Sequence, residues 1–135
     1  MEQLIIDSKL SEIDKVRDFL CKTLLDDHLS EEEYFTIELS LIEICTNIVR
    51  YAYPVKKDKI FFKTWREKEC FFLEIRDNGI PFDPRKAKKP DIKEILKTER
   101  VGGFGVMIWR KFMDGFDYKR EQNQNILIIS KIISS

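Results

Sequence analysis

A long apolar run, LSLIEICTNIVRYAYP at residues 39–54, limits how this chain can fold. Its apolar residues lie on every side of a helix, which predicts a helix that is buried on more than one side. Two polar residues, Glu43 and Asn47, interrupt the run. Burying an unpaired polar group costs about 2 to 7 kcal/mol, and burying an isolated charge costs far more. These two side chains therefore need partners that their apolar neighbours cannot supply.

The composition favours one soluble, cytoplasmic domain that spans residues 1–135. With 135 residues, 43% of them hydrophobic, the chain is large enough for one core and too short for two domains. No apolar stretch reaches the roughly 18 residues of a membrane span, and the N-terminus lacks a signal-peptide pattern. Cys21, Cys45 and Cys70 are widely spaced in apolar sequence, which indicates reduced core thiols rather than a disulfide framework.

The charge balance narrows the class of partner. The chain has 24 basic and 24 acidic residues and a formal net charge of zero. Binding to a nucleic-acid backbone or to an anionic membrane depends on an excess of basic side chains. We therefore expect protein or small-molecule partners, with no direct contact to nucleic acid or membrane.

Two helices are expected in the first part of the chain. One begins at Ser11 and ends near Asp27, and a longer one runs from Ser30 to about Tyr53 before a proline stops it. Both begin with a serine followed three positions later by an acidic residue, and in the longer helix that residue is a glutamate, as in a capping box. The single histidine, His28, falls between them, where a solvated loop position is expected.

Five segments have the composition of strands. Residues 3–7 could form a short strand, IFFKTW and CFFLEIR predict one hairpin, and FDYKRE and NILIISKII predict another around Gln122–Gln124. Between the hairpins, VGGFGVMIWRKFMD begins a helix directly after glycines. One helical layer on one face of an antiparallel sheet is the economical arrangement of such elements.

The first polar cluster lies in the buried helix. Glu43 and Asn47 are four positions apart, so their side chains lie about 5 to 6 Å apart on one helix face. A carboxylate can accept a proton and an amide oxygen can bind a hard cation, a combination that fits Mg²⁺-dependent phosphoryl transfer. The alternative is a buried polar pair bonded internally or to the backbone, and the cluster alone favours that alternative.

The second cluster, IRDNGIPFDP, places Asp77 at a strand end and Gly79 in the following sharp turn. An aspartate at the bottom of an apolar pocket could accept a hydrogen bond from an exocyclic amine and so select adenine. A bare Asp-Asn-Gly turn with no ligand is the alternative.

The third cluster is GGFG at residues 102–105, directly before a helix. Free backbone amides at a helix N-terminus bind phosphate, and Gly103 and Gly105 permit its close approach. A turn with no ligand is the commoner role of such an isolated glycine pair.

Taken in this order, the three clusters resemble the GHKL ATPase superfamily of gyrase and the histidine kinases. The asparagine box corresponds to IEICTNIVRYAY, the first glycine box to DNGIPFDP and the second to GGFGVMIWRKFMD. The sequence is most similar to the bacterial anti-sigma-factor serine/threonine kinases, and PFDP and the final FMD are typical of that branch. The likeness covers essentially the whole chain, as a single histidine-kinase-like ATPase domain. It implies the Bergerat fold, an α/β (α+β) two-layer sandwich with a mixed, mainly antiparallel sheet and helices on one face.

The resemblance also implies roles in binding ATP or ADP with Mg²⁺ and in phosphoryl transfer. It implies that Glu43 is the general base, Asn47 the Mg²⁺ ligand and Asp77 the residue that recognises adenine. Gly79 would form a supporting turn, and Gly103 and Gly105 would form the phosphate loop. Residues 85–101 would form the ATP lid, in which Arg100 would contact the terminal phosphates. Two features depart from the family pattern. Tyr51 stands where many relatives have histidine, and the terminal hairpin lacks the Gly-Thr pair of many relatives, where Asn125 is the candidate substitute.

The function implied by the resemblance is that of an ATP-dependent anti-sigma factor and serine/threonine protein kinase. It would form a homodimer, bind a sigma factor, and phosphorylate a small antagonist protein in a partner switch that regulates transcription. The alternative is a nucleotide-regulated module that binds a sigma factor or another regulator without phosphorylating anything. Glu43 beside Asn47 favours the kinase, since binding alone needs no base. A structural domain with degenerate boxes is disfavoured by their intact spacing.

Overall fold

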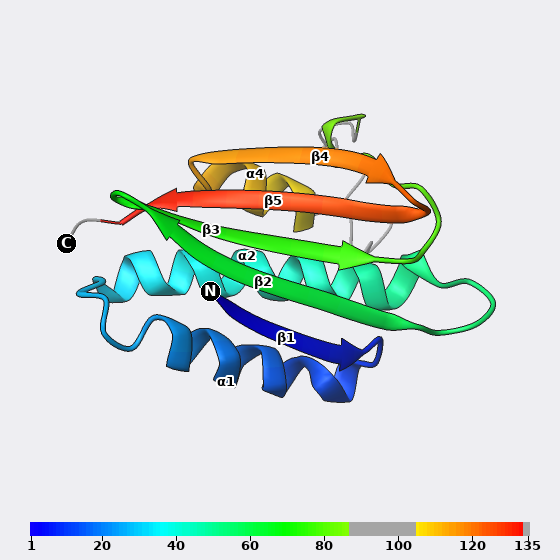
Figure 1. The fold of residues 1–135 in the computed structure, drawn as a ribbon, viewed down its shortest axis with the longest axis horizontal. Helices are drawn as coiled ribbons and strands as arrows, with labels where there is room; N and C mark the ends of the chain where they lie inside the picture. The colour runs from blue at the N-terminus through cyan, green and yellow to red at the C-terminus, as the bar shows by residue number, and fades with distance from the viewer. Residues whose placement is uncertain (87–104, 134–135) are drawn as a thin grey trace, which may run out of the picture.

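Alternating apolar residues build a five-stranded sheet in the computed structural model, which describes residues 1–86 and 105–133 (Figure 1). The strands are β1 Glu2–Asp7, β2 Lys59–Glu67, β3 Cys70–Asp77, β4 Gly115–Glu121 and β5 Gln124–Ile132. Their order is β1-β2-β3-β5-β4. Every pairing of these described strands is antiparallel, so the parallel part of the expected mixed sheet is absent from them.

Both expected hairpins form. In the β4–β5 hairpin, Gln122 and Asn123 form the turn, with φ of 51° and 63°. Two successive residues with positive φ match the twist of the flanking strands, as in a type I′ turn. The apolar strand β5 is paired on both edges, with β3 and with β4. The register thus places β5 opposite the strand that ends at Asp77.

The described helical segments are a 3₁₀ turn Leu10–Glu12, α1 Ile13–Thr23, α2 Glu31–Asn47, a π-helix Ile48–Ala52, a 3₁₀ turn Pro84–Lys86 and α4 Gly105–Phe112. The capping box of α2 forms as predicted: the Ser30 hydroxyl accepts from Glu33 N at 3.0 Å, and the Glu33 carboxylate accepts from Ser30 N at 3.1 Å. The predicted cap at Ser11 is wrong, because that residue lies in the 3₁₀ turn and α1 begins after it without a side-chain cap.

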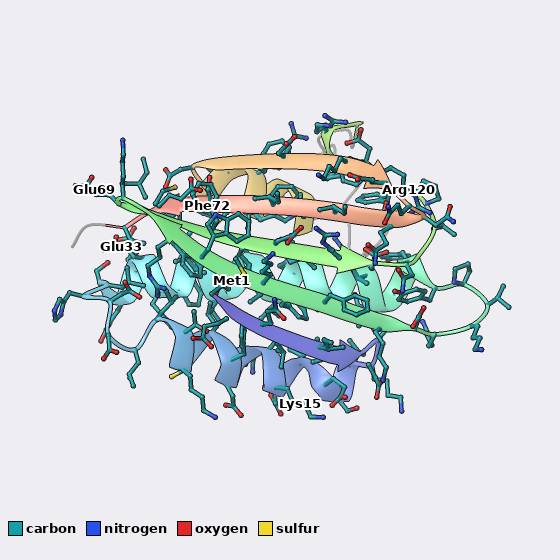
Figure 2. The ribbon with its side chains drawn as sticks, in the orientation of Figure 1. Met1, Lys15, Glu33, Glu69, Phe72 and Arg120 are labelled. Atoms are coloured by element: carbon teal, nitrogen blue, oxygen red, sulfur yellow. The ribbon has the colours of Figure 1, made fainter. Side chains whose placement is uncertain are left out.

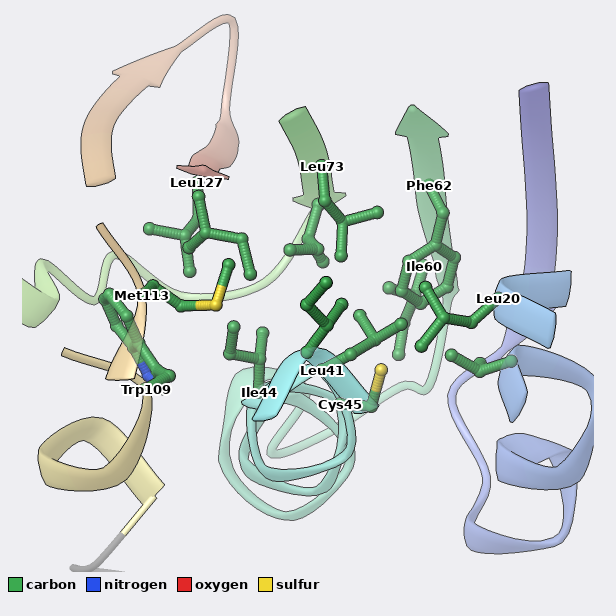
Figure 3. Close-up of a cluster of buried hydrophobic side chains, with 14 of the residues drawn as sticks. Leu20, Leu41, Ile44, Cys45, Ile60, Phe62, Leu73, Trp109, Met113 and Leu127 are labelled. Atoms are coloured by element: carbon green, nitrogen blue, oxygen red, sulfur yellow. The ribbon is translucent and has the colours of Figure 1, made fainter. Parts of the chain in front are cut away.

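The helices cover one face of the sheet (Figure 1). Figure 3 shows the contact, with Leu41, Ile44 and Cys45 of α2 pointing toward sheet residues that include Leu73. Cys45 and Leu73 are fully buried, and Trp109 of α4 is 1% exposed. Burying a large apolar side chain contributes about 1.5 to 3 kcal/mol. The α2 helix is therefore held by the sheet and by the neighbouring helices, which explains its apolar circumference.

The three cysteines are free thiols, as expected. Cys45 belongs to the core, but the expectation of core positions is wrong for Cys21, which is exposed, and for Cys70, which is half-buried. His28 is exposed in the α1–α2 connection, as predicted. Within the described ranges, no helix has the length and apolarity needed to cross a membrane.

The sheet face opposite the helices is also partly apolar. Trp65 and Phe72 stack there across β2 and β3 with ring centroids 5.3 Å apart, and Figure 2 labels Phe72. Ile5 and Ile132 on the same face are 60% and 58% exposed. The alternation of side chains along each strand thus presents apolar residues on both faces of the sheet.

Candidate nucleotide-binding site

Asp77 lies at the end of β3 with 4% of its surface exposed. Its Oδ1 atom accepts hydrogen bonds from Gly79 N at 2.9 Å and from Asn125 Nδ2 at 3.0 Å. Its Oδ2 atom accepts none from the residues that the structure describes. Burial raises the pKa of Asp77, and the two hydrogen bonds partly offset that rise. One oxygen of a poorly solvated carboxyl group is thus available to a donor such as an exocyclic amine.

Gly79 anchors the first glycine box to the helical layer. A Cβ atom at this position would lie 2.4 Å from Ala52 O and 2.6 Å from Ala52 Cβ. The close approach lets Ile80 N donate to Ala52 O at 2.9 Å, and Asn78 N donates to the Tyr53 hydroxyl at 2.8 Å. No side chain larger than hydrogen fits at position 79 without moving this backbone.

Glu43 and Asn47 lie on the helix that reaches this turn. Both side chains are half-buried, and neither makes a hydrogen bond or ion pair within the described part of the chain. The internally bonded polar pair that sequence reasoning left open is therefore not formed among these residues. Asn47 ends α2 and is followed directly by the π-helix, whose last residue, Ala52, meets Gly79. Widened helical turns of this kind are frequent at functional sites.

The third cluster is described only in part. Gly105 is the first residue of α4, and α4 packs along α2, the helix of Glu43 and Asn47. Gly103 and Arg100 lie outside the described residues, as does nearly all of the expected lid at 85–101. The helix of the first cluster therefore packs against the helix that follows the third cluster, and the π-helix that continues it meets the turn of the second cluster.

Asn125 contacts Asp77 from the neighbouring strand β5. It is 6% exposed and faces Asp77 in the β3–β5 register. Its Nδ2 atom donates to Asp77 Oδ1 and, at 2.8 Å, to Ile80 O. Its Oδ1 atom accepts from Phe82 N at 3.2 Å and from the Tyr118 hydroxyl at 2.5 Å. Both amide hydrogens and both acceptor positions are used, so Asn125 holds the carboxylate and the turn rather than replacing a ligand contact.

Arg120, which sequence reasoning missed, supports the same turn from β4 (Figure 2). Its Nη1 atom donates to Gly79 O at 2.7 Å, and its charge opposes the rise in the pKa of Asp77. The signal that could have found it is strand register: the β4–β5 hairpin pairs Arg120 with Asn125, and β5 pairs Asn125 with Asp77.

Replacing Asn125→Ala should destabilise the fold by roughly 2 to 4 kcal/mol, because buried groups that lose their only partners each cost about 1 to 3 kcal/mol. Urea denaturation gives the difference in unfolding free energy. Gln124→Ala is the matched control. Gln124 lies one position before Asn125 on β5, and its replacement removes a single exposed hydrogen bond to Asn78. If Asn125→Ala and Gln124→Ala have the same urea midpoint, Asn125 does not hold Asp77 and the turn in place.

The oxygen atoms of Glu43 and Asn47 suit a metal ion that arrives already bound to phosphate. Among the described residues, no three His, Cys, Asp or Glu side chains gather into a metal cluster. Mg²⁺ retains several waters and takes only one or two protein oxygens together with substrate phosphates. The half-buried amide of Asn47, with the Glu43 carboxylate one turn earlier, fits that limited demand.

Comparison with known proteins identifies this arrangement. Residues 6–131 match the family described as Histidine kinase-like ATPase domain. The chain belongs to this family. Membership in an ATPase family implies nucleotide binding, and it confirms the resemblance of the chain to the GHKL ATPase superfamily.

Two relatives of this histidine kinase-like ATPase domain are named protein kinases. The chain is 31% identical over 107 residues to serine/threonine-protein kinase BtrW of Bordetella bronchiseptica, a match that covers 78% of this chain and 75% of BtrW. It is 24% identical over 100 residues to serine-protein kinase RsbW of Bacillus cereus, covering 71% of this chain and 62% of RsbW. The resemblance to the serine/threonine-kinase branch is thus confirmed.

Solved structures confirm the fold of the ATPase domain. A chain in the crystal structure of the SiaB–SiaC complex from Pseudomonas aeruginosa matches with a TM-score of 0.60 at 13% identity, covering 96% of this chain and 89% of that one. Histidine kinase AdeS of Acinetobacter baumannii matches with a TM-score of 0.50 at 15% identity, covering 100% and 69%. At these identities the likeness concerns the fold alone.

Proposed function

We propose that this protein is an ATP-dependent serine/threonine protein kinase and anti-sigma factor that phosphorylates an antagonist protein. The observation that carries the proposal is the position of Glu43 and Asn47 on α2, because the π-helix that directly continues α2 contacts the Asp77–Gly79 turn through Ala52. A base and a metal-binding amide then lie on the element that borders the adenine-recognising carboxylate. The kinase names of BtrW and RsbW support the same reaction.

In this proposal, binding residues surround the nucleotide from two sides. Asp77 Oδ2 accepts the adenine amine, because Oδ1 already accepts two hydrogen bonds from within the protein. The amide oxygen of Asn47 would hold Mg²⁺, and the ion would neutralise and orient the phosphates. The backbone at Gly103 and Gly105 receives the phosphate chain, and Arg100 contacts its terminal group.

Glu43 is the proposed general base. Its carboxylate accepts the proton of the attacking serine or threonine hydroxyl of the antagonist as the oxygen approaches the terminal phosphoryl group. A binding module without phosphoryl transfer would need no carboxylate beside Asn47. That module, which would hold a sigma factor or another regulator under nucleotide control, is the second candidate.

Partner binding belongs to the same proposal. The partners are a sigma factor and an antagonist protein, and the active form is a homodimer in the cytoplasm. The relative in the SiaB–SiaC structure forms a complex with another protein, which supports a protein partner. The sigma factor and the homodimer follow from the resemblance to the anti-sigma-factor kinases.

ADP or ATP with Mg²⁺ should stabilise the protein, because a ligand that binds only the native state adds RT ln(1 + [L]/Kd), about 2.7 kcal/mol at a hundredfold excess over Kd. A thermal shift assay measures this, and incubation with labelled ATP, Mg²⁺ and the antagonist encoded beside the protein measures transfer. Label on the antagonist supports the kinase. A thermal shift without label supports the binding module, and no shift at saturating nucleotide refutes both.

A further inference from the structure

A groove of about 690 Å³ lies where α1 leads into α2. Its base includes Leu24, which is 3% exposed, and the half-buried Leu29 and Tyr34. Its edges carry Leu25 and Phe35, which are 73% and 60% exposed. Exposed apolar side chains that gather around one depression and are rimmed by polar residues are typical of surfaces that bind another molecule.

The lining of this groove is acidic. Asp27, Glu31, Glu32 and Glu38 line it, and no lysine or arginine among the described residues does. The whole chain, in contrast, has equal numbers of acidic and basic residues. Asp27 is paired with Arg66, whereas Glu31 and Glu32 are exposed in the first turn of α2. Their position there stabilises the helix N-terminus, and it also places two carboxylates next to the apolar edge.

The walls of the groove are held together by contacts between elements. The Tyr34 hydroxyl lies beside the Cys21 thiol of α1 and the Glu38 carboxylate of α2. Arg66 of β2 donates from Nε to Asp27 Oδ1 at 3.1 Å, which ties the α1–α2 connection to the sheet. A surface that is already organised binds a partner at a smaller entropic cost.

We propose that this groove binds a basic amphipathic helix of a partner protein. The apolar face of such a helix would cover Leu25 and Phe35, and its lysines or arginines would meet Glu31 and Glu32. The same carboxylates repel nucleic acid and anionic membrane surfaces, which leaves a basic protein segment as the complementary occupant.

The groove is distinct from the nucleotide site. It lies at the N-terminal end of α2, whereas Asn47 ends this helix of 17 residues. At 1.5 Å per residue the two ends are about 25 Å apart, and Figure 1 shows the α1–α2 connection and the C-terminal end of β3 at opposite ends of the molecule. A partner helix and a nucleotide can therefore bind at the same time, so the inference goes beyond the proposed kinase function.

The probe is a synthetic lysine–leucine amphipathic peptide of about 14 residues, long enough for several helical turns. Its counterpart has glutamate in place of lysine. Titration into the ¹⁵N-labelled protein should shift amides around the groove with the lysine peptide, less strongly at high salt, and should give no shifts with the glutamate peptide. No binding of the lysine peptide, or shifts confined to another surface, would overturn the proposal.

Two variants test the apolar and the acidic parts separately. Phe35→Ser should weaken binding of the lysine peptide at least about tenfold, while Val55→Ser, a 96% exposed control outside the groove, should not. The double replacement Glu31→Lys with Glu32→Lys should lose the lysine peptide and gain the glutamate peptide. Unchanged peptide affinity in Phe35→Ser, or unchanged charge preference in the double variant, would refute the assignment.

Melting curves establish that each variant is folded, and ADP binding is measured on the same samples. The groove variants should bind ADP like the unaltered protein, because the two sites are separate. Groove variants that lose peptide binding and keep ADP binding support the proposed groove. If the unaltered protein binds the peptide but does not bind ADP, the groove is supported and the proposed kinase is rejected.

Discussion

Glu43→Gln is expected to slow phosphoryl transfer to the antagonist by roughly 10² to 10⁴. The amide has the same size as the carboxylate and preserves α2, but it cannot take the proton of an attacking hydroxyl. Nucleotide affinity should change little, because Asp77, Asn47 and the glycine loop supply the binding contacts in the proposed site. Single-turnover transfer from labelled ATP gives the rate, and calorimetric titration gives the affinity.

Glu67→Gln is the matched control for Glu43→Gln, since Glu67 is exposed at the far end of β2 and its replacement should leave transfer unchanged. Loss of both nucleotide binding and transfer in Glu43→Gln would mean that Glu43 holds the site together. Full transfer activity would exclude Glu43 as the base and would favour substrate-assisted transfer or the binding module.

Asp77→Asn is expected to weaken adenine-nucleotide binding by about 1.5 to 3 kcal/mol, the value of a hydrogen bond to a charged group. The asparagine oxygen can keep the bonds from Gly79 N and Asn125 Nδ2. Its amide nitrogen then occupies the place of Oδ2 and directs a donor at the amine of adenine. The discrimination between ADP and GDP should therefore shrink, since guanine carries a carbonyl where adenine carries the amine.

Calorimetry with ADP and GDP measures both affinities, and Asp117→Asn, an exposed replacement on β4, serves as the control. An Asp77→Asn variant that is folded and retains full ADP affinity would rule out Asp77 as the adenine acceptor.

Asp77→Asn should not lower the free energy of unfolding at neutral pH. Burial raises the pKa of Asp77 above its unfolded value, so between these two pKa values the native state binds more protons than the unfolded state. Stability is then lost as pH rises through this interval, and the ionised carboxylate at neutral pH is a cost that asparagine avoids. Urea midpoints should show the variant equal or more stable at neutral pH, with the difference shrinking in acid. A less stable variant at neutral pH would contradict the burial effect.

Local features were predictable from the residue order. The capping box of Ser30 and Glu33 depends on two residues one turn apart, and it formed as predicted. Both hairpins depend on alternating apolar residues around a short turn, and both formed. The order of the three boxes indicated the family, which the comparison with known proteins confirmed. These features depend on neighbours along the chain, so short stretches of sequence contain most of the information.

Contacts between distant segments were decided only by the tertiary structure. The four hydrogen bonds of Asn125, the guanidinium of Arg120 on Gly79 O, and the approach of Gly79 to Ala52 each join residues from different elements. The exposure of Cys21 likewise follows from how α1 lies on the sheet. Such contacts depend on strand order and helix position, and an asparagine in an apolar strand carries no local sign of the partner across from it. The carboxylate at the centre of the proposed site was therefore recognisable in the sequence, whereas the contacts of Asn125 and Arg120 that support it were decided by the pairing of β5 with β3 and with β4.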